Sequence, residues 1–219
     1  MKERIAAELP ELDIDRLWIG TFHSICARIL RRRIDRIGYN RSFTIYDRDD
    51  QKSVLKEILK EQNTSEDALG VKLNSVISSI SSHKNRRISP QELEATEPRF
   101  GFMRAVAMLY PLYEQKLKKN SALDFDDLIL KALELFEKDR DTLNEYRERF
   151  LYVFVDEYQD TNRMQYDLVK TLSEKHKNLC VVGDIDQSIY KFRGADIKNI
   201  LDFEKDFPNA SLVKLEQNY

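Results

Sequence analysis

The sequence has little cysteine and no long hydrophobic run. Its two cysteines, Cys26 and Cys180, lie far apart among apolar neighbours, so we expect neither a disulfide framework nor a zinc site. The three histidines have no metal-ligand spacing either. No stretch of about eighteen apolar residues is present, and the N-terminus lacks the apolar core of a signal peptide. These absences predict a globular, cytoplasmic protein with no membrane partner.

Neither sign of charge dominates. The chain has 36 basic and 38 acidic residues, so its net charge of −2 does not indicate a polyanionic ligand. Basic residues nevertheless gather locally, and such clusters suit contacts with phosphates. A solvated helix face is the commoner explanation for any single cluster. The three clusters contain Arg28, Arg31, Arg32, Arg33, Arg36 and Arg41; Lys84, Arg86 and Arg87; and Lys116, Lys118 and Lys119.

Short apolar runs predict four strands. They lack polar alternation, which is typical of strands covered on both faces. The runs lie at 17–20, 151–155, 179–182 and 212–215. Helical patterns at 163–176 and about 197–207 separate the last three runs. Strand and helix alternating in this way predict a parallel sheet with right-handed crossovers.

Between residues 47 and 149 the apolar spacing is almost entirely helical. The helical patterns lie at 51–62, 71–82, 104–119 and 124–137. The fold class that we predict is α/β: a parallel sheet with a mostly α-helical inserted subdomain. The sheet domain is expected at 1–47 and 140–219, and the helical subdomain at 48–139.

Polar side chains follow two of the predicted strands. Asp156 and Glu157 come directly after the first, and Gln187 lies in the turn after the second. Parallel sheets gather their ligands at the carboxyl ends of strands. One carboxylate there can hold Mg²⁺ while the other activates a water molecule that attacks a phosphate. The alternative is that these residues only cap the helices that follow.

Aromatic residues alternate with cations at Tyr190, Phe192 and Arg193, a pattern that suits single-stranded nucleic acid because bases stack on rings while cations meet phosphates. Phe125 follows the start of a predicted helix and is a further candidate. For each of these residues, burial under a loop or in a core is an equally simple explanation.

Five segments, in order, resemble motifs of the UvrD/PcrA/Rep-like superfamily-one DNA helicases. They are TFHSICARILRR at 21–32, SALDFDDLI at 121–129, VDEYQDTN at 155–162, VGDIDQSIYKFRGAD at 182–196 and LEQNY at 215–219. The resemblance covers nearly the whole chain. It implies a RecA-like P-loop NTPase fold, ATP and Mg²⁺ as cofactors, and 3′-to-5′ movement on single-stranded DNA.

The resemblance also implies individual roles. Asp156 would coordinate Mg²⁺, Glu157 would be the catalytic base and Gln187 would sense the γ-phosphate. Arg193 would couple the nucleotide to DNA, and Tyr219 would stack on adenine. The expected DNA-contacting residues are Thr21, Phe22, His23, Phe125, Tyr190, Phe192 and Arg193. Phe192 stands where the family usually has tryptophan, and stacking should survive with less area.

The family's glycine-rich phosphate loop is missing from these residues. None of the six glycines is followed by lysine, so no G-x-x-x-x-G-K-[ST] motif exists. We therefore expect an N-terminally truncated piece of the first motor domain that does not hydrolyse ATP by itself. Its expected partners are single-stranded DNA, single/double-strand junctions, and repair or replication proteins. The alternative is a natural non-catalytic module that binds DNA or protein. A nuclease lacks support because no nuclease domain is present.

Overall fold

The computed structural model describes residues 2–8, 10–11, 13–96, 100–187 and 203–214. The chain forms two compact units, residues 1–149 and residues 150–219. None of the helices in the described ranges is long and apolar enough to cross a membrane.

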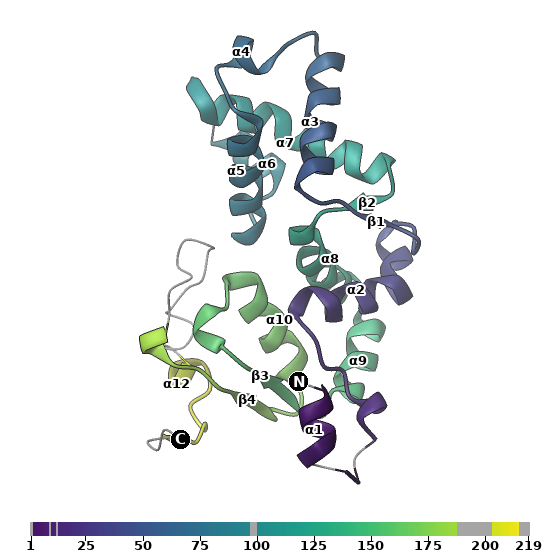
Figure 1. Ribbon diagram of the computed structural model, residues 1–219, viewed down its shortest axis with the longest axis vertical. Coiled ribbons are helices and arrows are strands. Elements are labelled where there is room, and N and C mark those ends of the chain that lie inside the picture. The colour runs from purple at the N-terminus through teal and green to yellow at the C-terminus, as the bar shows by residue number, and fades with distance from the viewer. Residues whose placement is uncertain (1, 9, 12, 97–99, 188–202, 215–219) are drawn as a thin grey trace. The chain divides into compact units, whose positions relative to one another are not determined.

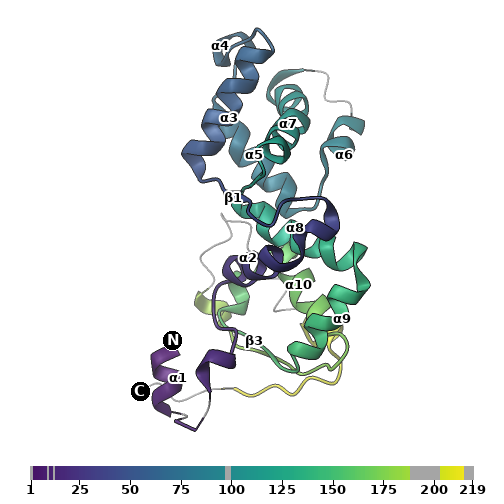
Figure 2. The same cartoon turned by 90° about the vertical axis from the view of Figure 1, so that its right-hand side faces the viewer.

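A helical bundle forms one end of the first unit (Figures 1 and 2). Its helices are α3 (Arg48–Glu61), α4 (Glu66–Leu69), α5 (Leu73–Asn85), α6 (Pro90–Ala95) and α7 (Gly101–Lys119). Aliphatic and tyrosine side chains at three- and four-residue spacing face one another in a shared core. The helical patterns predicted at 51–62, 71–82 and 104–119 are therefore confirmed, with small shifts at their ends.

Side chains next to the helix starts fix where several helices begin. The Asp47 carboxylate accepts hydrogen bonds from the backbone of the first turn of α3, and the Asp50 carboxylate accepts the backbone N–H of Asp47. Ser89 and Glu92 do the same for α6, which has Pro90 at its first position. Each such cap contributes about 1 kcal/mol.

The other end of the first unit is built on α8 (Phe125–Lys138), which packs against α2 (Phe22–Arg33) and α9 (Arg140–Arg149). A 3-10 turn, η2 (Ile34–Ile37), also packs on α8. Because α8 contacts α5 of the bundle as well, it joins the two ends of this unit. The boundaries predicted at 47 and 140 place α8 with the helical subdomain, and they stay a prediction.

Two very short strands connect these ends of the first unit, and the sequence did not reveal them. β1 (Thr44–Ile45) pairs in parallel with β2 (Ala122–Leu123). Thr44 and Tyr46 donate backbone hydrogen bonds to the carbonyls of Ser121 and Leu123. With two residues each, neither strand has enough apolar pattern to be recognised from sequence.

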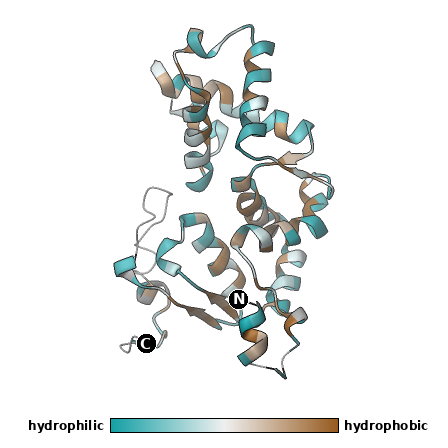
Figure 3. Ribbon diagram, in the orientation of Figure 1, coloured by the Kyte–Doolittle hydropathy of each residue, from teal (hydrophilic) through white to brown (hydrophobic). Residues whose placement is uncertain are grey.

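The second unit contains the predicted strand–helix–strand arrangement. β3 (Val153–Val155) and β4 (Leu179–Val181) pair in parallel, and α10 (Arg163–Ser173) connects them. Leu168, Val169 and Leu172 of α10 are buried, and this helix contacts β3. Hydrophobic colour runs along both strands in Figure 3. The remaining described elements are the turns η3 (Tyr158–Asp160) and η4 (Ile185–Gln187) and the short helix α12 (Phe203–Asp206).

Two predicted strands are wrong for the residues that the structure describes. Residues 17–20 and 212–214 have no strand structure, because no neighbouring backbone forms a ladder with them. Trp18 instead packs edge-on against Tyr146, with 5.9 Å between ring centroids. The helix predicted at 197–207 falls partly outside the described residues, and its described part contains α12. Before residue 17 lie α1 (Lys2–Glu8) and the turn η1 (Ile14–Arg16).

Candidate functional site

The acidic pair Asp156–Glu157 lies at the carboxyl end of β3, as the sequence predicted. The backbone turns sharply here, because Glu157 has a φ of 51° in the left-handed region. Such a conformation costs a residue other than glycine about 1–3 kcal/mol and is often found at functional sites. The parallel ladder continues past the strand ends, with Val182 donating to the carbonyl of Val155 and Tyr158 donating to that of Val182. The turn is thus held in place, and both carboxylates are exposed to solvent.

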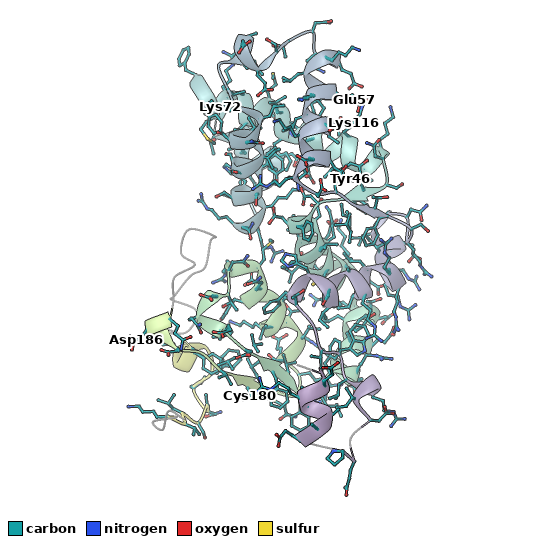
Figure 4. All side chains as sticks on the ribbon, in the orientation of Figure 1. Tyr46, Glu57, Lys72, Lys116, Cys180 and Asp186 are labelled. Carbon is teal, nitrogen blue, oxygen red and sulfur yellow. The ribbon has the colours of Figure 1, made fainter. Side chains whose placement is uncertain are left out.

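The end of β4 carries the second part of the site. Asp184 accepts a hydrogen bond from Gln187 Nε2 on one carboxylate oxygen, at 2.7 Å, and from the backbone of Asp186 on the other, at 3.0 Å. Gln187 is exposed and therefore accessible to a ligand. Asp186, labelled in Figure 4, belongs to the same turn.

A buried glutamine joins these two strand ends, and its importance was not recognised in the sequence. Gln159, 1% exposed, donates from Nε2 to Glu157 Oε2 at 2.7 Å. Its Oε1 accepts the backbone N–H of Asp184 at 3.0 Å. The signal was present, because Gln159 lies inside the VDEYQDTN segment, but nothing in the pattern showed that it would be buried.

Asp156 suits the role of a magnesium ligand. Mg²⁺ in nucleotide sites is bound by one or two carboxylates, with water and phosphate oxygens completing the shell. One oxygen of Asp156 accepts the backbone N–H of Glu157, which orients the carboxylate. The donor chemistry of this strand end therefore fits the cofactor that the resemblance implies.

A second group of predicted residues meets in the first unit. His23 and Phe125, which are 102 residues apart in the sequence, lie edge to face with 5.8 Å between ring centroids. Phe125 is 51% exposed, which leaves ring surface available for stacking. Burial lowers the pKa of His23, against the opposing attraction of Asp126, so the imidazole is neutral near pH 7.

Thr21 and Phe22 begin the same helix. Thr21 is the N-cap of α2, where its hydroxyl accepts the backbone N–H of Ser24 at 3.3 Å. Beside Phe125 and Asp126 lies a surface depression of about 470 Å³, lined also by Ser81 and by residues of the 47–51 segment. Four of the predicted site residues lie outside the described ones: Tyr190, Phe192, Arg193 and Tyr219.

The basic clusters divide into paired and unpaired cations. In the first cluster Arg33 pairs with Glu145, Arg36 with Asp139, and Arg41 with Asp35. In the third, Lys116 reaches Glu57 and Glu61, as Figure 4 shows for the labelled Glu57. Neighbouring carboxylates thus already neutralise many of the arginine and lysine charges that were considered in the sequence as phosphate contacts.

Three other arginines surround the indole of Trp18. The guanidinium carbons of Arg28, Arg32 and Arg149 lie 3.9, 5.4 and 5.6 Å from its ring centroid. All three are exposed, and none forms an ion pair with a carboxylate within the described part of the chain. Guanidinium groups stacked on an aromatic ring keep their N–H edges available for phosphate oxygens.

Lys84 is neither available to a phosphate nor part of a solvated helix face, so both explanations offered for its cluster are wrong for this residue. It is fully buried, and its Nζ lies 2.6, 2.8 and 2.7 Å from carboxylate oxygens of Glu114, Asp124 and Asp127. Among the described residues these carboxylates lie close enough to one another to hold a metal ion. The lysine ammonium, however, already supplies the positive charge that such a group of carboxylates needs.

The mixed α/β fold, with its small parallel sheets and acidic strand end, is that of a helicase motor domain. The model of the UvrD/REP helicase N-terminal domain family matches residues 1–208, and the chain belongs to this family. The recognition made from the five motifs is thereby confirmed.

Relatives named ATP-dependent DNA helicase PcrA match the chain closely. The protein from Bacillus subtilis (strain 168) is 53% identical over 219 residues, which are 100% of this chain and 29% of the relative. The one from Staphylococcus aureus (strain Mu50) is 50% identical over 221 residues, covering 100% of this chain and 30% of the relative. The chain therefore spans less than a third of the length of these relatives.

Proposed function

We propose that this chain is part of the first motor domain of an ATP-dependent DNA helicase that moves 3′ to 5′ along single-stranded DNA in repair or replication. The observation that carries the proposal is the acidic pair at the end of β3, joined through Gln159 to the turn after β4. Membership of the UvrD/REP family supports it, as do relatives named ATP-dependent DNA helicases.

In this proposal Asp156 holds Mg²⁺, and Glu157 accepts the proton of the water that attacks the γ-phosphate. Gln187 senses that phosphate, Arg193 couples it to DNA, and Tyr219 stacks on adenine. When bound, Mg²⁺ neutralises phosphate charge. The exposed position of Asp156, Glu157 and Gln187 at two adjoining strand ends supports these roles.

We place the DNA contacts on two kinds of side chain. Phe125, with His23 at its edge, offers a stacking surface, and Thr21 and Phe22 begin the helix that bears His23. Tyr190 and Phe192 are proposed from the sequence as further stacking residues. Arg28, Arg32 and Arg149 offer unpaired guanidinium groups for phosphates. Single/double-strand junctions and repair or replication proteins are the further partners that we propose, in the cytoplasm.

The domain assignment is part of the same proposal. Residues 1–47 and 140–219 belong to the motor domain, and residues 48–139 form its helical insertion. Because these 219 residues contain no Gly-Lys phosphate loop, they lack the backbone N–H groups and the lysine that would bind the phosphates. We propose that the segment alone does not hydrolyse ATP.

The test uses the full-length protein that contains this segment. Its ATPase rate should rise with single-stranded DNA, and Glu157→Gln should lower kcat about 100- to 10,000-fold, the usual contribution of a general base. Glu174→Gln is the matched control, because it makes the same change at the C-cap of α10 rather than at the end of β3. Wild-type protein without DNA-stimulated ATPase, or Glu157→Gln with full activity, would contradict the proposal.

The alternative is a non-catalytic module that binds DNA or protein. The unpaired arginines around Trp18 favour it, because they can bind a polyanion without any nucleotide. DNA binding by a wild-type full-length protein that shows no ATPase activity would select this alternative.

A further inference from the structure

Gln159 has two partners of different kinds, one at each strand end. Its amide nitrogen donates to the Glu157 carboxylate, at 2.7 Å, and its amide oxygen accepts from the backbone of Asp184, at 3.0 Å. A carboxylate can only accept and a backbone N–H can only donate, so a single orientation of the amide satisfies both. The side chain is therefore held in one position, with 1% of its surface exposed.

The partner of Gln159 at the β3 end does not need this bond for its own stability. Glu157 is exposed, so water could solvate its carboxylate. The bond instead restricts the orientation of a long side chain whose backbone lies in the left-handed region. A buried donor that orients an exposed carboxylate is the arrangement expected behind a group that must meet a substrate in a defined position.

The hydrogen bonds continue beyond Asp184. Its carboxylate accepts Gln187 Nε2 at 2.7 Å, and its backbone carbonyl accepts the backbone N–H of Gln187 at 3.2 Å. A continuous path thus runs from Glu157 through Gln159 and Asp184 to Gln187. Each step is a direct hydrogen bond or a covalent link within one residue.

We propose that Gln159 is a positioning residue, which sets the orientation of Glu157 and ties it to the turn that bears Gln187. A ligand that displaces Gln187 then also shifts Asp184, and through Gln159 the carboxylate of Glu157. This inference rests on the proposed function, because it assigns a consequence to water activation by Glu157. Gln159 itself does not touch the substrate.

The experiment measures DNA-stimulated ATPase kinetics of the full-length protein with two substitutions. Gln159→Met keeps the shape of the side chain and removes both hydrogen bonds. We expect kcat to fall about 10- to 100-fold, the effect of a misplaced catalytic group. KM for ATP and the affinity for single-stranded DNA should change less than about twofold, because the binding groups stay in place.

Gln159→Glu supplies a signature that a merely structural role would not produce. A protonated carboxyl at this position can donate to Glu157 and accept from Asp184, whereas an ionised one would repel Glu157. The activity of Gln159→Glu relative to wild type should therefore rise as the pH falls from about 8 to about 6. The activity of Gln159→Met relative to wild type should stay constant over that range.

Ser173→Ala is the matched control. It also removes a buried hydrogen bond, from Ser173 Oγ to the carbonyl of Val169, but within α10 alone. Its kcat should equal that of wild type. A folded Gln159→Met protein with kcat within twofold of wild type would overturn the inference, as would a Gln159→Glu ratio that does not change with pH.

If Gln159→Met fails to fold, the pH dependence of the activity of Gln159→Glu relative to wild type tests the positioning role by itself. The proposed function is judged separately by the wild-type and Glu157→Gln proteins. Loss of activity in Glu157→Gln together with normal, pH-independent kinetics in both Gln159 variants would leave that function standing and refute only the positioning role.

Discussion

Replacing Lys84 by methionine tests the buried charge cluster of the first unit. The substitution keeps the aliphatic stem but removes the ammonium, which lies within 2.8 Å of an oxygen of each of three carboxylates. Glu114, Asp124 and Asp127 would then face one another without a counter-charge. Breaking a buried ion pair in this way costs about 3–5 kcal/mol. That is a large share of the roughly 5–15 kcal/mol by which a folded domain is typically stable.

The pH dependence of this loss has a definite sign. Although burial opposes it, the three carboxylates raise the pKa of Lys84 well above its usual value. The lysine therefore stays charged at all pH values below the ordinary lysine pKa, and its contribution is lost only in strong alkali. Burial, followed by repulsion from Asp124, raises the pKa of Asp127 well above its usual value even in wild type.

Without the ammonium, the buried carboxyl groups of Asp124 and Asp127 should hold protons more tightly in the folded than in the unfolded chain. A folded-state pKa raised above the unfolded value stabilises the protein at low pH, and that stabilisation is lost as the pH rises through the folded-state pKa. The deficit of Lys84→Met relative to wild type should therefore be smaller at about pH 5 than at about pH 8.

Urea unfolding of the chain, followed by far-ultraviolet circular dichroism at both pH values, measures this deficit. Lys116→Met is the control, because Lys116 also contacts two carboxylates. Its partners Glu57 and Glu61 are 53% and 54% exposed, so water screens them and the loss should be smaller. Equal losses for the two variants, or a Lys84→Met deficit that grows on acidification, would refute the reasoning.

Three further outcomes are expected of the 219-residue chain. Iodoacetamide should label the exposed Cys180 in the native protein and leave Cys26 unmodified, because burial raises the pKa of the Cys26 thiol to about 12; mass spectrometry of the peptides detects this. Phe125→Ala should weaken single-stranded DNA binding by about 1–3 kcal/mol with little change in its salt dependence. The double substitution Arg28→Ala and Arg32→Ala should lower the slope of log affinity against log salt by about 0.7 for each phosphate that the protein no longer neutralises.

Each of these outcomes has a matched comparison. The double substitution of Arg33 and Arg36, which already pair with Glu145 and Asp139, should leave the salt slope nearly unchanged. Equal slopes for the two double variants would mean that pairing does not decide which arginines bind DNA. A larger change in salt slope for Phe125→Ala than for the arginine variant would contradict the stacking role. Labelling of Cys26 at the rate of Cys180 would show that the Cys26 thiol is accessible rather than buried.

Most of the helices and the β3–α10–β4 unit could be predicted from the sequence, because the patterns that indicate them lie in short stretches of chain. The spacing of apolar residues predicted α3, α5, α7 and α8, and Asp47 and Asp124 fix two of their starts by capping. The unit formed by β3, α10 and β4 was predicted from two apolar runs around one amphipathic stretch. Residues 17–20 looked the same, yet they form no strand, because a strand depends on a neighbour that a local pattern cannot supply.

The candidate site was predictable only in part for the same reason. Asp156, Glu157 and Gln187 follow apolar runs, so their place at strand ends could be inferred. The connection that Gln159 makes between them could not be inferred, because it depends on which neighbouring side chain the fold turns inward. The meeting of His23 with Phe125 depends on the packing of α2 against α8.

By itself the sequence determined the class of fold, the family and the acidic strand end, because periodicity, helix caps and ordered motifs lie in short stretches of chain. Only the tertiary structure decided which charges are available to a ligand. Lys84 and Arg28 are equivalent cations in the sequence. Folding brings carboxylates from distant parts of the chain to Lys84 and buries the lysine with Asp124 and Asp127, while Arg28 stays exposed on Trp18. Electrostatic energy depends on distance and burial, and folding sets both.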